Sequence, residues 1–89
     1  KELKMSKWDK LLSRVHKLSK DIRFREVCKI MDSYGYEMKG SSGGSSHYTF
    51  RKSGCAPITI PKDEPVKIVY IKMIRDIILN EEANQHEND

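Results

Sequence analysis

Hydrophobic positions recur with the period of a helix in three stretches of this chain. In the first stretch, residues 6–20, apolar residues follow the i, i+3, i+4, i+7 spacing that predicts an amphipathic helix; they are Trp8, Leu11, Leu12, Val15 and Leu18. Ser6 is the expected N-cap, because its hydroxyl can accept from an exposed amide of the first turn. Lysines and arginines occupy the other side of this helix.

A second helix is predicted at about residues 23–34. Its buried stripe contains Phe24, Val27, Cys28 and Met31, with either Ile30 or Tyr34 completing it. Ile22 and Val27 are placed to form a hydrophobic staple, and Glu26 stands at the third helical position. Gly35 is expected to end the helix, because glycine enters the left-handed conformation without a Cβ clash.

Alternation with period two then predicts three short strands at about 36–39, 46–52 and 57–61. In the middle strand it places Tyr48 and Phe50 on the core face and His47, Thr49 and Arg51 on the polar face. The glycine–serine run 40–45 is expected to be a mobile hairpin loop. Pro57 and Pro61 indicate an edge strand, since proline cannot donate a ladder hydrogen bond.

The strongest periodic signal predicts a last helix after Pro65, with a stripe of seven residues: Val66, Val69, Tyr70, Met73, Ile74, Ile77 and Ile78. Ile68, Ile71 and Leu79 fall outside this stripe, as surface for the first helix, a second copy or a partner. The acidic segment 80–89 is expected to be disordered. The whole pattern predicts an α+β domain, in the order helix, helix, three antiparallel strands, helix.

Composition narrows the class of partner. The 89 residues suit one domain, with 37% hydrophobic and 34% charged residues and a formal net charge of +4. Residues 80–89 hold four acids and no lysine or arginine, so residues 1–79 carry +8. Such a basic body favours a polyanion, RNA or DNA ahead of a membrane surface, although lysine-rich helices are often only solvated faces.

Other classes of function receive little support. Cys28 and Cys55 have no CxxC spacing, and Cys28 is expected to be a reduced core cysteine. No set of His, Cys, Asp and Glu has metal-ligand spacing, so no metal or other cofactor is expected. No signal peptide or apolar run of membrane-spanning length is visible, which makes the cytoplasm the expected compartment. Met5 is a candidate native start, with residues 1–4 preceding it.

His47 is the residue best placed for chemistry. It follows a loop that gives access from solvent, and it faces away from the aromatic side of its strand. Imidazole titrates near neutral pH, so it can take a proton from a 2′-hydroxyl or deliver one to a leaving oxygen. Most surface histidines of this kind have no catalytic role, and neither His16 nor His86 is placed to act with it.

From about Asp21 to Leu79 the sequence resembles the HicA-type toxins of bacterial type II toxin–antitoxin modules. The resemblance rests on Gly44-Ser45-Ser46-His47-Tyr48-Thr49-Phe50, followed by Pro57-Ile58-Thr59-Ile60-Pro61 and the helix that begins Val66-Lys67-Ile68. Phe24-Arg25-Glu26-Val27 and Tyr34-Gly35-Tyr36-Glu37 belong to it as well. Longer members of that family also carry an N-terminal helix, matched here by residues 1–20.

The resemblance implies a fold like that of a double-stranded-RNA-binding domain over residues 21–79, with the helices on one face of the sheet. It implies an endoribonuclease that cleaves mRNA, with His47 as the catalytic residue and a HicB-type antitoxin as the partner that blocks the site. A homodimer or a larger toxin–antitoxin complex is the expected assembly. Lys39, Ser46, Thr49, Arg51 and Lys52 are the candidate RNA-binding residues, and Lys62 or Lys67 could add to them.

Three hypotheses remain open from the sequence. The first is a metal-independent ribonuclease, in which Tyr48, a lysine or a second subunit supplies the other proton-transfer group. The second is a non-catalytic RNA-binding module of the same fold, which recognises shape and phosphates. The third is a protein-interaction subunit that uses Ile68, Ile71 and Leu79 as its contact surface.

Overall fold

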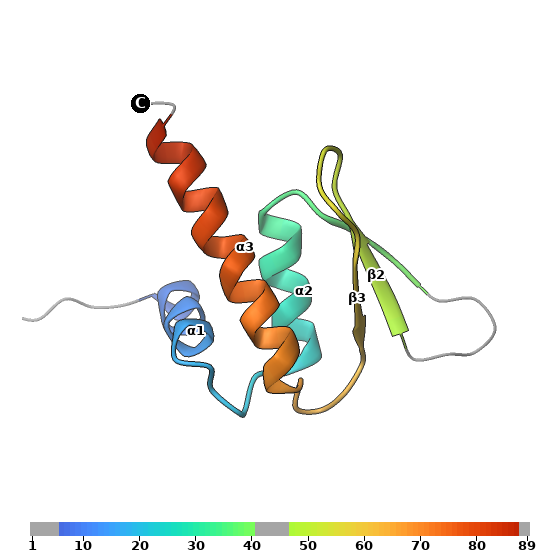
Figure 1. Ribbon diagram of the computed structural model, residues 1–89. Coiled ribbons are helices and arrows are strands. Elements are labelled where there is room, and N and C mark those ends of the chain that lie inside the picture. The colour runs from blue at the N-terminus through green and yellow to red at the C-terminus, as the bar shows by residue number, and fades with distance from the viewer. Residues whose placement is uncertain (1–5, 41–46, 88–89) are drawn as a thin grey trace, which may run out of the picture.

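Three helices and three strands make up the fold. The computed structural model describes residues 6–40 and 47–87. In chain order the elements are α1 (Lys7–His16), α2 (Phe24–Ser33), β1 (Glu37–Lys39), β2 (His47–Arg51), β3 (Ile58–Pro61) and α3 (Ile68–Glu87) (Figure 1). The α+β class and the predicted order of elements are confirmed.

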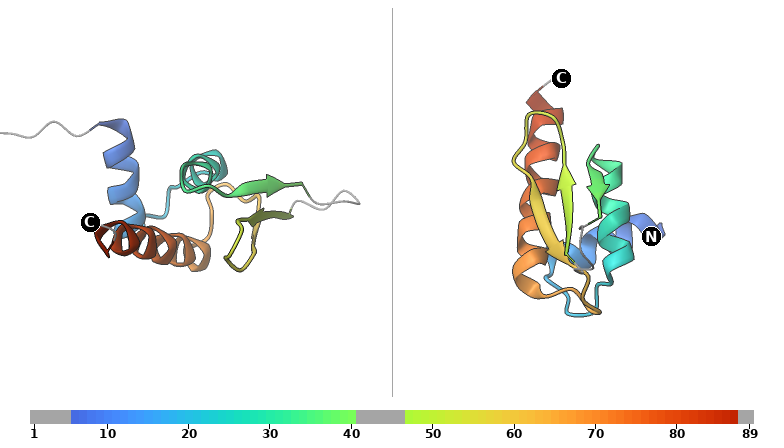
Figure 2. Two further views of the ribbon diagram at one scale, coloured as in Figure 1. Left: turned by 90° about the horizontal axis from the view of Figure 1, so that it is seen from above. Right: turned by 90° about the vertical axis from the view of Figure 1, so that its right-hand side faces the viewer.

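The sheet is antiparallel, with strand order β1-β2-β3, so β3 is an edge strand as its prolines predicted. Figure 2 shows α2 and α3 side by side on one face of this sheet, with α1 on the far side of the helices. There α1 packs against α3. This is the double-stranded-RNA-binding-domain-like arrangement predicted above, with α1 added to it.

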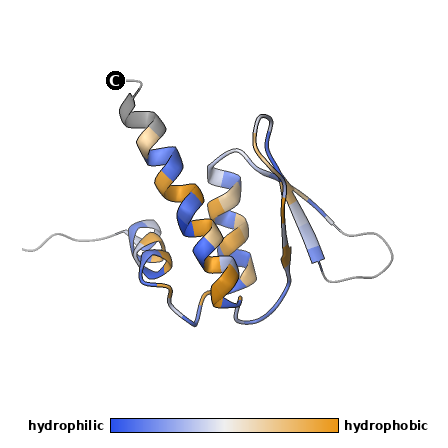
Figure 3. Ribbon diagram, in the orientation of Figure 1, coloured by the Kyte–Doolittle hydropathy of each residue, from blue (hydrophilic) through white to orange (hydrophobic). Residues whose placement is uncertain are grey.

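The core lies between the sheet and the helices. Phe50 pairs with Met38 on one side and Ile58 on the other, and Tyr48 pairs with Ile60. Residues opposite each other in antiparallel strands share a face of the sheet, and Phe50 and Ile60 are fully buried on this one. Apolar positions of the helices meet them (Figure 3). The predicted orientation of the middle strand is therefore confirmed.

The helix ends follow local chemistry. The Asp9 amide donates to Ser6 Oγ at 3.0 Å, which confirms the predicted N-cap. The Glu26 carboxylate accepts from the Arg23 amide at 2.9 Å, and Gly35 has a φ of +91°. The predicted extension of α1 to residue 20 is wrong, because Leu18 adopts a left-handed backbone with a φ of +56°. That turn keeps Leu18 packed against the core.

The predicted apolar stripe of α3 is partly wrong. Ile71, which was placed outside the stripe, is fully buried, whereas Val69 is 58% exposed and Met73 is 38% exposed. Because α1 packs against α3, this helix has a second side that can be buried, which a single stripe facing the sheet does not include. The true buried stripe is Ile71, Ile74 and Ile78. Ile71 is therefore not available as a contact surface for a partner.

The acidic segment after Asn80 is helical rather than disordered as far as Glu87. Extending a helix adds one hydrogen bond per residue without a new nucleus, and Glu, Ala and Gln are good helix formers. Lys52 Nζ also lies 2.6 Å from Glu81 Oε2, which ties this part of α3 to the end of β2. Residues 88–89 and the loop residues 41–46 lie outside the described part of the chain.

An ionic cluster joins α1 to α2. Arg14 Nη1 donates to Glu26 Oε2 at 2.9 Å, and Arg14 Nη2 donates to the Asp21 carbonyl at 3.0 Å. The hydrogen bond from Arg14 is the main cause that lowers the pKa of the half-buried Glu26 carboxyl. The predicted Ile22–Val27 staple lies beside this cluster, and both side chains are fully buried. These contacts hold the end of α1 against the start of α2.

Shortening single side chains of α3 to alanine should distinguish the observed buried stripe from the predicted one, through the free energy of unfolding. Ile71→Ala leaves a cavity in a closed core, so we expect it to lower the free energy of unfolding by about 2–5 kcal/mol. Val69→Ala removes an exposed side chain, and we expect a change within about 0.5 kcal/mol. Urea denaturation followed by circular dichroism measures both values. Equal losses for the two variants would contradict the assignment of Ile71 to the core.

Acid should weaken the α1–α2 cluster. The lowered pKa of Glu26 means that the folded state prefers its carboxylate, so this stabilisation is present above the ordinary value of 4.5. It is lost as the pH falls through the lowered pKa. We expect Glu26→Gln to be less stable than wild type by about 1 kcal/mol at pH 7, with the difference vanishing at low pH.

Glu64→Gln is the control for this measurement, because the Arg23–Glu64 pair is longer, at 3.5 Å, and more exposed. Urea denaturation from pH 7 to pH 2.5 gives both stability profiles. A Glu26→Gln deficit that stayed constant over this range would show that the lost ion pair is not its cause.

Candidate RNA-binding and catalytic face

His47 is the first residue of β2, and its side chain is exposed on the face of the sheet that points away from the helices. It pairs with Pro61 of the edge strand β3. The right-hand view of Figure 2 looks onto this outer face, and among the described residues no helix covers it. The predicted direction of His47 is therefore confirmed, and no described helix lies over this face.

Three polar residues share one row across the outer face, next to His47. Lys39 of β1, Thr49 of β2 and Thr59 of β3 are directly paired in the register. Lys39 and Thr59 are thus diagonal neighbours of His47, and such positions are roughly 7–8 Å apart. The sheet brings Lys39 and Thr49 together with His47, as the sequence predicted.

The two threonines form a hydroxyl pair. Their Oγ1 atoms are 3.0 Å apart, and one hydroxyl donates to the other. Each hydroxyl has one proton, so the pair keeps one proton for an outside acceptor such as a phosphate oxygen. Thr59 was predicted to face outward but was not among the candidate RNA-binding residues. Its contribution depends on the register of β3 against β2, which the period of either strand does not specify.

Arg51 lies on the same face but at the other end of β2. It lies four positions after His47, which is roughly 13 Å along a strand. Glu37 is its direct partner on β1, so an acid balances the charge at that end of the sheet. A phosphate held beside His47 would therefore be near Lys39. Arg51 is placed to contact a different phosphate of the same RNA chain.

Lys52 is not part of the outer face. Its ammonium group bonds to Glu81 of α3 at 2.6 Å and lies 5.6 Å from the centre of the Tyr36 ring. The alternation that places Phe50 in the core also places Lys52 on the helix side, so the sequence contained this signal. Ser46, another candidate RNA-binding residue, lies outside the described residues.

Tyr48 is poorly placed as the second proton-transfer group. It lies on the helix side of β2, and its ring centre is 5.3 Å from that of Phe24. His16 is exposed on α1, away from the sheet. Lys62 and Lys67 are exposed beyond β3. Lys39 is therefore the lysine that the sheet register brings nearest to His47 on the outer face.

The cysteines stand apart from this face. Both are free thiols, and Cys55 is exposed in the turn after β2. Cys28 lies beside the core with its Sγ 3.6 Å from Met38 Sδ, and burial raises its pKa. Within residues 6–40 and 47–87 no three His, Cys, Asp or Glu side chains are grouped to hold a metal ion.

Comparison with known proteins gives no information about this site. No protein-family model, curated protein or solved structure matches the chain. A search of the described helices finds none with the length and apolar character that crossing a bilayer requires.

Lys52 and Arg51 are neighbours in sequence with different roles, which substitution can distinguish. Lys52→Met removes the Glu81 ion pair and the contact with Tyr36, and we expect a loss of roughly 1 kcal/mol in the free energy of unfolding. Arg51→Met changes an exposed residue, and we expect a change within about 0.5 kcal/mol. Thermal and urea denaturation measure both variants. A larger loss for Arg51→Met would contradict this placement.

Proposed function

We propose that this protein is an endoribonuclease of the HicA toxin type, which cleaves mRNA on the outer face of its sheet. The observation that carries the proposal is the position of His47, exposed on a helix-free face beside Lys39 and the Thr49–Thr59 hydroxyl pair. An imidazole can transfer protons in phosphodiester cleavage, and a cation and a hydroxyl donor can stabilise the charge on the phosphate. The basic charge of residues 1–79 supports a polyanionic substrate.

In the proposed reaction His47 takes the proton from a ribose 2′-hydroxyl. The 2′-oxygen attacks the adjacent phosphorus, and the bond from phosphorus to the 5′-oxygen breaks. The products are a 2′,3′-cyclic phosphate and a 5′-hydroxyl end, so no water is consumed. The proton for the leaving oxygen comes from a second group, and Lys39 is the candidate that the register favours over Tyr48.

The hydroxyl pair and Lys39 stabilise the charge on the phosphate in this scheme. The transition state carries more negative charge on the non-bridging oxygens than the substrate does, so donors already aimed there lower the barrier. Arg51 holds the next phosphate and contributes to binding rather than to bond cleavage. Lys52 has no direct part, because Glu81 engages it on the opposite face.

The same proposal assigns a HicB-type antitoxin as the inhibitory partner and the bacterial cytoplasm as the compartment. An inhibitor that covers the open outer face would block access to His47. The contact surface predicted from Ile68, Ile71 and Leu79 needs revision, because only Leu79 of the three is exposed, at 46%. Val69 and Met73 are further exposed apolar residues of α3.

Cleavage of an mRNA transcript in the presence of a chelator tests the proposal. We expect His47→Ala to reduce the rate by about 10²–10⁴-fold, the usual contribution of a positioned acid or base. His16→Ala is the matched control, since this second exposed histidine lies on α1, and we expect it to cleave like wild type. Gel analysis of the RNA ends also reports whether cyclic phosphates form.

Binding measured beside cleavage separates the enzyme from a non-catalytic RNA-binding module. Phosphate contacts make affinity fall steeply with salt, and His47→Ala should keep most of that affinity. Equal cleavage by wild type and His47→Ala would refute the catalytic role of His47. Salt-dependent binding without cleavage by any variant would favour the non-catalytic module.

A further inference from the structure

A groove between α1 and α2 lies on the side of the molecule away from the sheet. Its volume is about 580 Å³, which is enough for a nucleotide-sized group. Trp8 and Leu11 of α1 supply the apolar part of its lining. Lysines border it from both helices: Lys7 and Lys10 from α1, and Lys29 from α2. Neither His47 nor any residue of its row contributes to this groove.

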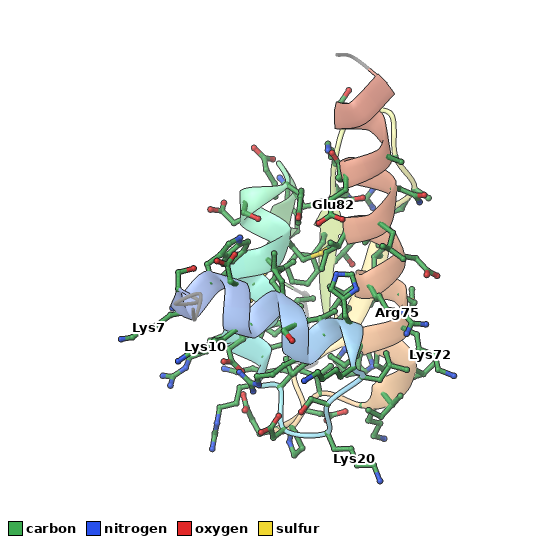
Figure 4. All side chains as sticks on the ribbon, turned by 90° about the vertical axis from the view of Figure 1, so that its left-hand side faces the viewer. Lys7, Lys10, Lys20, Lys72, Arg75 and Glu82 are labelled. Carbon is green, nitrogen blue, oxygen red and sulfur yellow. The ribbon has the colours of Figure 1, made fainter. Side chains whose placement is uncertain are left out.

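The period of α1 concentrates the cations on one side. Lys7, Lys10 and Arg14 follow the i, i+3, i+7 spacing, so they share a side of the helix, and Lys17 continues the series. Figure 4 shows Lys7 and Lys10 extending from the same side of α1, and Lys72 and Arg75 on α3 at the other side of the view. The sequence indicated a basic helix, but only the packing of α2 turns its flank into a groove.

The charge of the groove is not balanced locally. Glu26 is its acid, and Arg14 occupies both Glu26 oxygens, at 2.9 and 3.3 Å. In the described part of the chain no ion pair involves Lys7, Lys10 or Lys29. Three exposed lysines therefore line the groove beside an aromatic side chain, and none is in an ion pair with a described residue.

We propose that this groove binds a segment of single-stranded RNA, with a base against Trp8 and the phosphates on Lys7, Lys10 and Lys29. A cationic groove that contains an aromatic ring is the usual construction of a single-strand site, because every base has a face that can stack. An acidic helix is a poorer fit. It would need apolar pockets at i, i+3 and i+7, whereas Trp8 and Leu11 offer one short apolar patch.

The inference rests on the proposed ribonuclease function and adds an anchor for its substrate. The α1 helix, which lines the groove, lies on the far side of the helical layer from the sheet (Figures 1 and 2). A transcript held in the groove keeps its other segments near the His47 face at a raised effective concentration. A short oligonucleotide can occupy the groove without reaching that face.

Trp8 makes the test direct, because it is the single tryptophan of the chain. A uridine oligonucleotide of about eight nucleotides, within the usual site size, is titrated into full-length His47→Ala at low salt. We expect a saturable change in tryptophan fluorescence. Lys10→Gln with Lys29→Gln should weaken this binding at least about tenfold and reduce the salt slope by about 0.7 per lysine.

Lys72→Gln is a control outside the groove, since it removes one exposed positive charge on α3, and we expect it to leave the titration unchanged. Trp8→Leu, followed by fluorescence anisotropy of a labelled oligonucleotide, should weaken binding, whereas Trp8→Phe should preserve most of it. This aromatic rescue distinguishes stacking from a loss of folding. The helical content of each variant is checked by circular dichroism.

An unchanged tryptophan signal during RNA binding detected by anisotropy would overturn the groove assignment. Equal affinities for the Lys10/Lys29 double variant and Lys72→Gln would do the same. A peptide of alternating glutamate and leucine that binds more tightly than the oligonucleotide would point to a protein partner and overturn it as well. Cleavage is measured separately, so groove binding with no effect of His47→Ala on cleavage would reject the catalytic proposal and leave this one standing.

Discussion

The burial of Phe50 in the central strand is the constraint on which the rest of the site depends. Its ring is almost fully enclosed, 6.2 Å from that of Phe24, and that position fixes the face that β2 turns to the helices. Strand side chains alternate, so His47, Thr49 and Arg51 must then face outward. A slip of one residue would bury the histidine and expose the aromatics, at the cost of the core.

The N-terminal helix changes what the rest of the fold can expose. It packs on α3 and adds Leu11 and Val15 to the core that contains Ile71, and through Arg14 it is held against the start of α2. The same contact that secures α1 neutralises Glu26, the acid beside the groove lysines. Stability and surface charge are therefore coupled here: one ion pair holds the helices together and engages Glu26, so this acid does not pair with the neighbouring lysines of the groove.

The two proposed surfaces differ in what supports them. The outer face of the sheet combines an imidazole with a hydroxyl pair and a cation in the neighbouring row, a set suited to bond cleavage. The groove has an aromatic ring and lysines but no group for proton transfer, a set suited only to binding. The helical layer separates the two surfaces. Only a long RNA strand could therefore contact both at once, and a short one would occupy one of them.

Much of the fold followed from the sequence alone, because period, capping and turn chemistry are local. They predicted the six elements, the Ser6 cap, the turn at Gly35 and the outward direction of His47. Contacts between distant segments decided the rest. Ile71 is buried in a core to which α1 contributes, α3 reaches Glu87 with Glu81 held by Lys52, and Thr59 joins Thr49 because β3 pairs in one register. The groove likewise exists only where two helices meet, and no periodicity within either helix could have located it.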